Sequence, residues 1–110
     1  MADFIYLFRG GSMEGSPEQM QQQMQKWRIW IEELGKKGHH KSGEPLDRTG
    51  KVLSGKQRVV TDGPYAEAKD VVGGYLMVAA ETLATAVELA KGCPVFESGG
   101  SVEVRPVMKM

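Results

Sequence analysis

The stretch DFIYLFR (residues 3–9) alternates aromatic side chains with aliphatic ones, and Gly10 and Gly11 follow it. Such residues favour a β-strand, and paired glycines end one. Both faces of this predicted strand are apolar. A second segment of the same character runs from Val71 to Ala80, around Gly73-Gly74. We therefore expect these two strands to lie at the centre of a sheet.

Two helices are predicted between the strands. Ser16, Pro17 and Gln19 supply an N-cap, a proline at the first helical position and a capping-box partner. Thr82 can cap a second helix, which Gly92 and Pro94 end. The apolar stripe expected on the first helix consists of Met20, Met24, Trp27, Ile31 and Leu34.

The remaining pattern consists of short extended pieces. We predict a strand near His40 to Asp47, a small hairpin around Ser54-Gly55 and a final strand from Ser101 to Val107. The order βαββαβ favours a ferredoxin-like α+β sandwich, an antiparallel sheet with two helices on one face. The other face of the sheet would be bare and apolar, which monomers rarely tolerate. We expect a homodimer formed through that face, a dimeric α/β-barrel-type assembly.

Composition restricts the class of protein. The chain has 110 residues, of which 41% are hydrophobic, and its 14 basic and 14 acidic side chains cancel, so we expect a single domain over residues 1–110. Zero net charge argues against nucleic acid as a partner. No segment resembles a secretory leader or a membrane span, and Cys93 is the single cysteine, so we expect a cytoplasmic protein without a membrane partner.

Two motif-like segments are better explained as structure. Residues 50–56, GKVLSGK, have P-loop spacing, but Gln57 stands where the magnesium-binding Ser or Thr belongs, and a strand follows instead of a helix. His39 and His40 are adjacent, so on a strand they point to opposite faces and do not chelate one ion. We expect no metal and no cofactor.

Asp62 is the strongest candidate site residue. It stands in the turn Asp62-Gly63-Pro64-Tyr65, where glycine and proline fix the backbone. Its carboxylate could be a catalytic group in a ligand cleft, or it could bond only the amides of its own turn. Candidate ligand-binding neighbours are Arg9, Trp30 and Tyr65.

Longer runs carry a family resemblance. The runs are VTDGPYAEAK at 60–69, VGGY at 72–75, ELAKGCP at 88–94 and GGSVEVRPV at 99–107. They resemble the YCII-related family, and within it the branch named for its DGPF motif, with Tyr65 in place of the usual phenylalanine. The resemblance implies a ferredoxin-like fold that dimerises through its sheet. Proposals for other members involve a histidine on the first helix acting with an acid, but residues 16–34 hold no histidine, so only Asp62 transfers.

Two functions remain open from the sequence. The first is a dimeric protein that binds, and can transform, a small metabolite in a cleft near Asp62. The second is a non-catalytic dimeric regulatory or protein-interaction module. It could be linked to sigma-factor regulation, with which DGPF proteins are often associated. Whether the chain is an enzyme stays open at this point.

Overall fold

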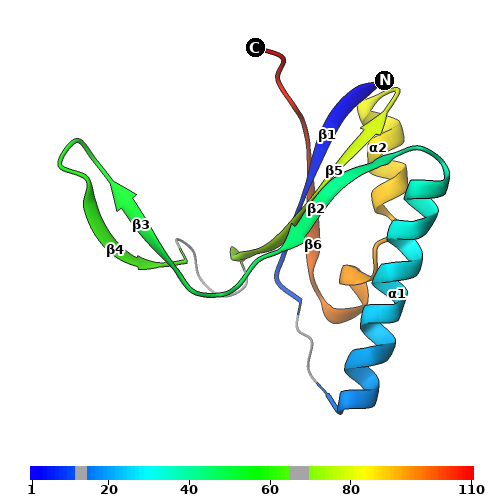
Figure 1. Cartoon of the computed structure of the whole chain (residues 1–110), viewed down its shortest axis with the longest axis horizontal. Helices are drawn as coiled ribbons and strands as arrows, with labels where there is room; N and C mark the ends of the chain where they lie inside the picture. Colours follow the sequence, from blue (N-terminus) through cyan, green and yellow to red (C-terminus); the bar gives the residue numbers. More distant parts are fainter. Residues whose placement is uncertain (12–14, 65–69) are drawn as a thin grey trace.

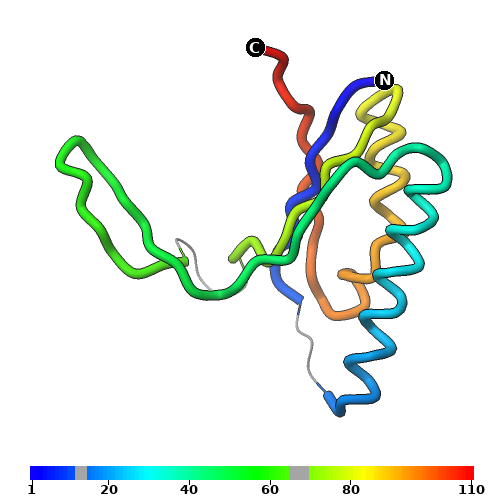
Figure 2. The backbone as a smooth tube through the Cα atoms, viewed as in Figure 1, coloured from blue at the N-terminus to red at the C-terminus, as the bar shows by residue number. Residues whose placement is uncertain are grey.

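The computed structural model describes residues 1–11, 15–64 and 70–110. Figure 1 shows the arrangement of the elements and Figure 2 the path of the chain through them. In chain order the elements are β1 (Ala2–Arg9), α1 (Pro17–Lys36), β2 (His40–Pro45), β3 (Gly50–Ser54), β4 (Val59–Gly63), β5 (Val72–Ala80), α2 (Leu83–Ala90), the 3-10 helix η2 (Pro94–Ser98) and β6 (Ser101–Pro106).

The main sheet has four strands in the order β2-β5-β1-β6, and all its pairings are antiparallel. The two strands predicted to be central, β1 and β5, occupy the centre. Helices α1 and α2 cover the same face of the sheet (Figure 1). The mixed α+β architecture is thus confirmed, and it is consistent with a ferredoxin-like fold.

Local signals place both helices. Ser16 caps α1 by accepting a hydrogen bond from the Gln19 amide, and the Gln19 side chain accepts one from the Ser16 amide. This reciprocal capping box satisfies amides that the first turn leaves unpaired. Thr82 caps α2 in the same way through the Thr85 amide.

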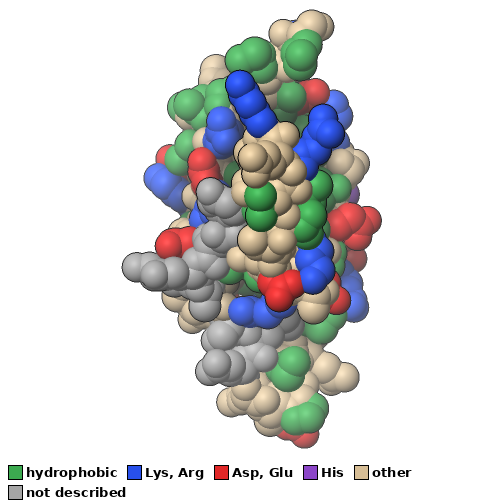
Figure 3. Space-filling view, turned by 90° about the vertical axis from the view of Figure 1, so that its left-hand side faces the viewer, with side chains coloured by type: hydrophobic (Ala, Val, Ile, Leu, Met, Phe, Trp, Pro, Cys, Tyr) green, Lys and Arg blue, Asp and Glu red, His purple; other side chains and the backbone are tan. Residues whose placement is uncertain are grey.

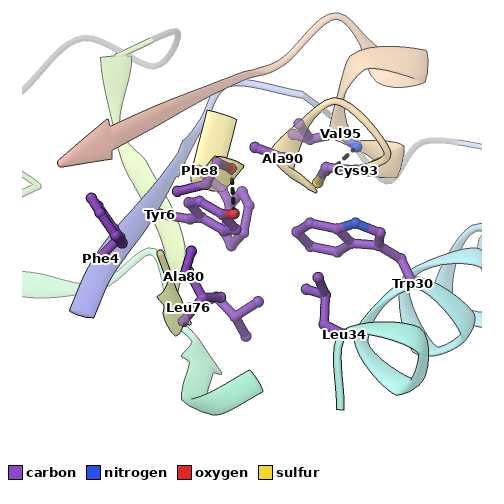
Figure 4. Packing of buried hydrophobic residues seen from close by; sticks show 12 residues of the cluster. Phe4, Tyr6, Phe8, Trp30, Leu34, Leu76, Ala80, Ala90, Cys93 and Val95 are labelled. Carbon is purple, nitrogen blue, oxygen red and sulfur yellow. Dashed lines mark hydrogen bonds between the residues drawn. The ribbon is translucent and has the colours of Figure 1, made fainter. Parts of the chain in front are cut away.

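The core lies between the sheet and the helices (Figure 4). Alternate residues of β1, namely Phe4, Tyr6 and Phe8, point into it because successive side chains of a strand face opposite sides. Tyr6 stacks on Trp30 of α1 with ring centroids 6.1 Å apart, and its hydroxyl donates a 2.6 Å hydrogen bond to the Ala86 carbonyl. The aromatic cluster therefore joins both helices to the sheet.

The predicted stripe on α1 needs a correction. Met20 and Met24 are exposed, whereas Trp30, which lies off that stripe, is buried together with Leu34. The reason is that the N-terminal half of α1 extends past the end of the sheet (Figure 1), so its apolar side chains have no strand to pack against. The helix buries the face that meets the sheet, which includes Trp27, Trp30 and Leu34.

The second face of the sheet carries no helix. Two cross-strand pairs, Ile5 with Met77 and Leu7 with Tyr75, form its apolar centre. Polar residues of the edge strands flank that centre. They are Ser42 and Glu44 on β2, and Glu103 and Arg105 on β6. We call these eight residues the open face.

Strands β3 and β4 form a separate two-stranded sheet, which we call the arm. The predicted hairpin is confirmed, with Leu53 opposite Val60 and Ser54 opposite Val59. The arm leaves the end of β2 and projects from the body on the side away from the helices (Figure 1). It gives the chain a radius of gyration of 15.5 Å, above the roughly 13 Å expected of a compact domain of this length.

Candidate functional site

A groove of about 410 Å³ lies where the arm leaves the main sheet. Its walls come from segments that are far apart in the sequence: the end of β1, the segment after β2, both ends of the arm, and the residues that lead into β5. The lining residues used below are Arg9, Leu46, Lys51, Pro64, Asp70 and Val72. The groove combines two basic residues, Arg9 and Lys51, and two acidic ones, Asp47 and Asp70, with an apolar wall.

Arg9 is the last residue of β1, and its side chain lies on the open-face side because Phe8 points into the core. Its Nη1 donates a 2.8 Å hydrogen bond to the Asp70 carbonyl, and its Nη2 donates a 3.0 Å bond to Oε1 of Glu103. These two bonds hold the guanidinium between β6 and the segment leading into β5. Arg9 lines the same groove as Gly63 and Pro64 of the Asp62 turn, and its role in ligand binding stays a prediction.

Asp62 lies on β4, next to the groove. Its carboxylate forms an ion pair with Lys51 Nζ, directly across the hairpin. The Asp62 side chain is 85% exposed. The ion pair therefore contributes little to stability, as is usual for ion pairs on a protein surface. Gly63 and Pro64 of the same turn line the groove. Asp62 lies at the rim of the groove, where it pairs with the lining residue Lys51.

Of the other two candidates, Trp30 is not brought to this groove. Trp30 is buried in the core between α1 and the sheet, and its indole Nε1 donates a 3.2 Å hydrogen bond to the Leu89 carbonyl. Its indole points from α1 into the core on the helix side of the sheet (Figure 4). Tyr65 falls among residues 65–69, outside the described residues, and its role stays a prediction.

A second hollow, of about 470 Å³, lies on the helix side. Ile29, Trp30 and Phe96 give it an apolar wall, and Cys93 lies at its base. Burial raises the pKa of the Cys93 thiol to about 12, although a hydrogen bond from the Val95 amide works in the opposite direction. A thiol that holds its proton so firmly is a poor nucleophile. This agrees with the interpretation of Cys93 as a small buried side chain.

The described residues form neither a metal-binding cluster nor a helix that could span a membrane. No group of three or more His, Cys, Asp or Glu side chains is placed to hold a metal ion within residues 1–11, 15–64 and 70–110. His39 uses its Nδ1 in a 2.7 Å contact with the Ala79 carbonyl, which is a structural role. In the same described part, no helix is long and apolar enough to cross a membrane.

Sequence reasoning missed the two residues of the groove that contact Asp62 and Arg9. Lys51 attracted attention only as part of a false P-loop, and Asp70 carried no signal at all. Lys51 meets Asp62 because the hairpin register pairs them, and Asp70 meets Arg9 because β1 and β5 are neighbours. A register assignment for the hairpin would have identified Lys51, whereas Asp70 contributes a backbone carbonyl, which any residue type supplies.

Comparison with known proteins places the chain in a family. A structural similarity links it to 5-chloro-2-hydroxyhydroquinone dehydrochlorinase from Burkholderia phenoliruptrix, solved in complex with 2,5-dihydroxybenzoquinone. The TM-score is 0.55 at 18% identity, covering 98% of this chain and 95% of that one. No curated protein sequence matches significantly. The profile of the YCII-related domain matches residues 6–110, and the chain belongs to the YCII-related family.

Proposed function

We propose that this protein is a homodimer that binds a small metabolite with an acidic group in the groove at the base of the arm, and that it belongs to the DGPF-motif branch of its family. The observation that carries the proposal is the placement of Arg9 and Lys51 in one groove with the Gly63-Pro64 turn. The recognisable motif of the sequence thus lies at the groove that holds Arg9 and Lys51.

Arg9 and Lys51 are the groups of the groove that favour an anionic ligand, and the apolar wall favours a ligand with an apolar body. Arg9 presents a planar guanidinium whose position two hydrogen bonds fix, which suits a carboxylate or phenolate. Within the described part of the chain, Lys51 pairs with the exposed carboxylate of Asp62, which an incoming anion can replace at small cost. Leu46 and Val72 supply apolar wall for the rest of the ligand.

The dimer is proposed from the open face. Its apolar centre of Ile5, Leu7, Tyr75 and Met77 is flanked on both edges by polar side chains. An apolar centre with a polar rim is the usual anatomy of a protein–protein interface. A twofold dimer would cover this face of both copies with one self-complementary contact.

Catalysis by Asp62 would depend on the second copy. A general base works best where it is shielded from water, and a single chain leaves the Asp62 side chain 85% exposed. The function that the groove of one chain supports is therefore binding. A reaction becomes chemically reasonable only where dimerisation covers this carboxylate.

The alternative is a non-catalytic dimeric regulatory or protein-interaction module, possible in the context of sigma-factor regulation. One observation favours it: Ile29 and Phe96, on the rim of the second hollow, are each about half exposed. Exposed apolar side chains around a hollow suit a protein partner. If this alternative holds, small molecules offered to the groove at the base of the arm would not stabilise the folded protein.

A thermal-shift experiment tests the binding proposal. The probes are benzoate, inorganic phosphate and 2,5-dihydroxybenzoquinone, the last because the structural relative was solved with it. A probe at ten times its Kd stabilises the folded protein by about 1.4 kcal/mol, which raises Tm by roughly 5 °C or more in a domain of this size. Lys51→Gln and Arg9→Gln should abolish that shift.

Lys91→Gln is the matched control, because Lys91 also forms an exposed ion pair, with Glu88, but lies beside the second hollow. It should keep the full shift. Stabilisation by no probe, or stabilisation that survives in Lys51→Gln and Arg9→Gln, would contradict the proposed site. A shift lost only in Lys91→Gln would move the ligand to the helix side.

A further inference from the structure

Among the residues that the structure describes, the arm has no further strand as a partner. In the described part of the structure, β3 and β4 pair with each other, and neither makes an extensive contact with another helix or strand. An isolated two-stranded hairpin is at best marginally stable in water. Yet Leu53, Val59 and Val60 are all more than half exposed. Figure 3 views the molecule from the arm's side and shows hydrophobic side chains among Lys and Arg there.

The arm has two distinct sides. Strand alternation and the hairpin register put Val52, Val59 and Thr61 on one side, and Leu53 and Val60 on the other. Val52 is partly buried and lines the groove together with residues of the main sheet. Gly63, on the same side as Val52, is also partly buried, whereas the residues on the Val60 side are exposed. The side that carries Val59 is therefore turned toward the main sheet, and Lys51, on the Val60 side, lines the groove at the base of the arm.

The small apolar area of the open face also indicates that this face alone does not form the dimer interface. A standard interface buries roughly 800 Å² on each partner. The four apolar side chains at the centre of the open face already cover one another in part, since each is only partly exposed in the single chain. They leave too little apolar area for a stable dimer without help. The exposed valine and leucine side chains of the arm supply further apolar area on the same side of the molecule.

We infer that the arm of each chain clasps the second copy, with its Val59 side on the partner, and that the partner thereby closes the groove at the base of the arm. This inference rests on the proposed dimer. The partner would lie between the arm and the open face, the space into which the arm projects (Figure 1). Arg9 and Val52 would then lie in a site enclosed by two chains, with Lys51 at its edge.

A second copy fits better than an unrelated partner. The formal net charge of zero means that two copies do not repel each other. In a twofold dimer the same contact forms twice, because each chain's arm packs on the other chain. One contact thus covers both open faces and both arms.

Val59 and Val60 offer a matched pair for the test. They are the same residue type, adjacent in sequence and 52% and 58% exposed, and they lie on opposite sides of the arm. Val59→Glu should weaken the dimer at least tenfold in Kd by sedimentation equilibrium, because it puts a charge into the clasped surface. Val60→Glu should change the Kd by less than about threefold. Circular dichroism should show both variants folded.

The outcomes separate the inference from the proposed function. A wild-type chain that sediments as a monomer overturns the dimer and the clasp with it. A wild-type dimer that Val59→Glu weakens no more than Val60→Glu does overturns the clasp alone. As a second readout, a benzophenone amino acid at position 59 should crosslink to the partner under light, and the same group at position 60 should not. Crosslinking from position 60 alone would also overturn the assignment of the arm's sides.

Discussion

Tyr6 and Cys93 are the two buried side chains whose ionisation the fold opposes most strongly. Burial raises the pKa of Tyr6 to about 12, and the neighbouring Cys93 thiolate adds to the rise. Burial likewise raises the pKa of Cys93 from 9.0 to about 12. The unfolded chain gives up these protons at lower pH than the folded one does. The two groups therefore link stability to alkaline pH.

We predict that the free energy of unfolding is unaffected by these groups below pH 9 and falls as the pH rises from 9 to about 12. The sign follows because, above about pH 9, the unfolded chain releases protons that the folded chain still binds, so rising pH favours the unfolded state. Urea unfolding at intervals between pH 8 and 11 measures the effect. Cys93→Ala should remove the part of the fall that begins near pH 9. An unchanged profile in this variant would contradict the burial of the thiol.

Asp62→Asn tests the rim of the groove. Because the Asp62–Lys51 pair is exposed, the substitution should change the free energy of unfolding by less than about 1 kcal/mol. It frees the Lys51 ammonium, so an anionic probe should bind as well as before or more tightly. Urea unfolding and the thermal shift with benzoate measure both quantities. A loss of more than about 2 kcal/mol would show that Asp62 has mainly a structural role in its turn.

At the scale of single elements, the sequence predicted where both helices begin, because a helix start depends on capping residues within one turn of it. The capping box of Ser16 and Gln19 and the cap of Thr82 were predicted and are confirmed. The stripe on α1 was not predicted correctly, because periodicity does not show where the sheet beneath a helix ends. Met20 and Met24 have the right spacing but lie beyond that end.

Glycine placement gives an element-scale prediction. A Cβ on Gly43 of β2 would lie 2.5 Å from both the Tyr75 carbonyl oxygen and Leu76 Cδ1, whereas one on Gly50 of β3 would meet nothing within 4 Å. Gly43→Ala should therefore push β2 away from β5 and destabilise the fold by roughly 1–3 kcal/mol. Gly50→Ala, the control, should change stability by less than about 0.5 kcal/mol. Equal stability of the two variants in urea unfolding would contradict the register of β2.

At the scale of the whole molecule, the strand order and the bare sheet face follow from the sequence, because the two double-sided apolar strands must be central. The groove does not follow from it. Arg9 and the Asp62 turn were identified separately, but their proximity depends on the direction in which the arm leaves β2, which no local pattern encodes. Trp30 was assigned to the ligand site because it lies off the predicted stripe, while the structure uses that position for the core.

The mass of the protein in solution tests the central claim that the open face joins two copies. Light scattering at micromolar concentration should give twice 12.1 kDa for the wild-type chain. Met77→Lys, at the centre of the open face, should move the mass toward one chain, while Ile29→Lys, exposed on the helix side, should leave the dimer intact. A monomeric wild-type chain, or a Met77→Lys variant that dimerises as well as Ile29→Lys, would contradict the account.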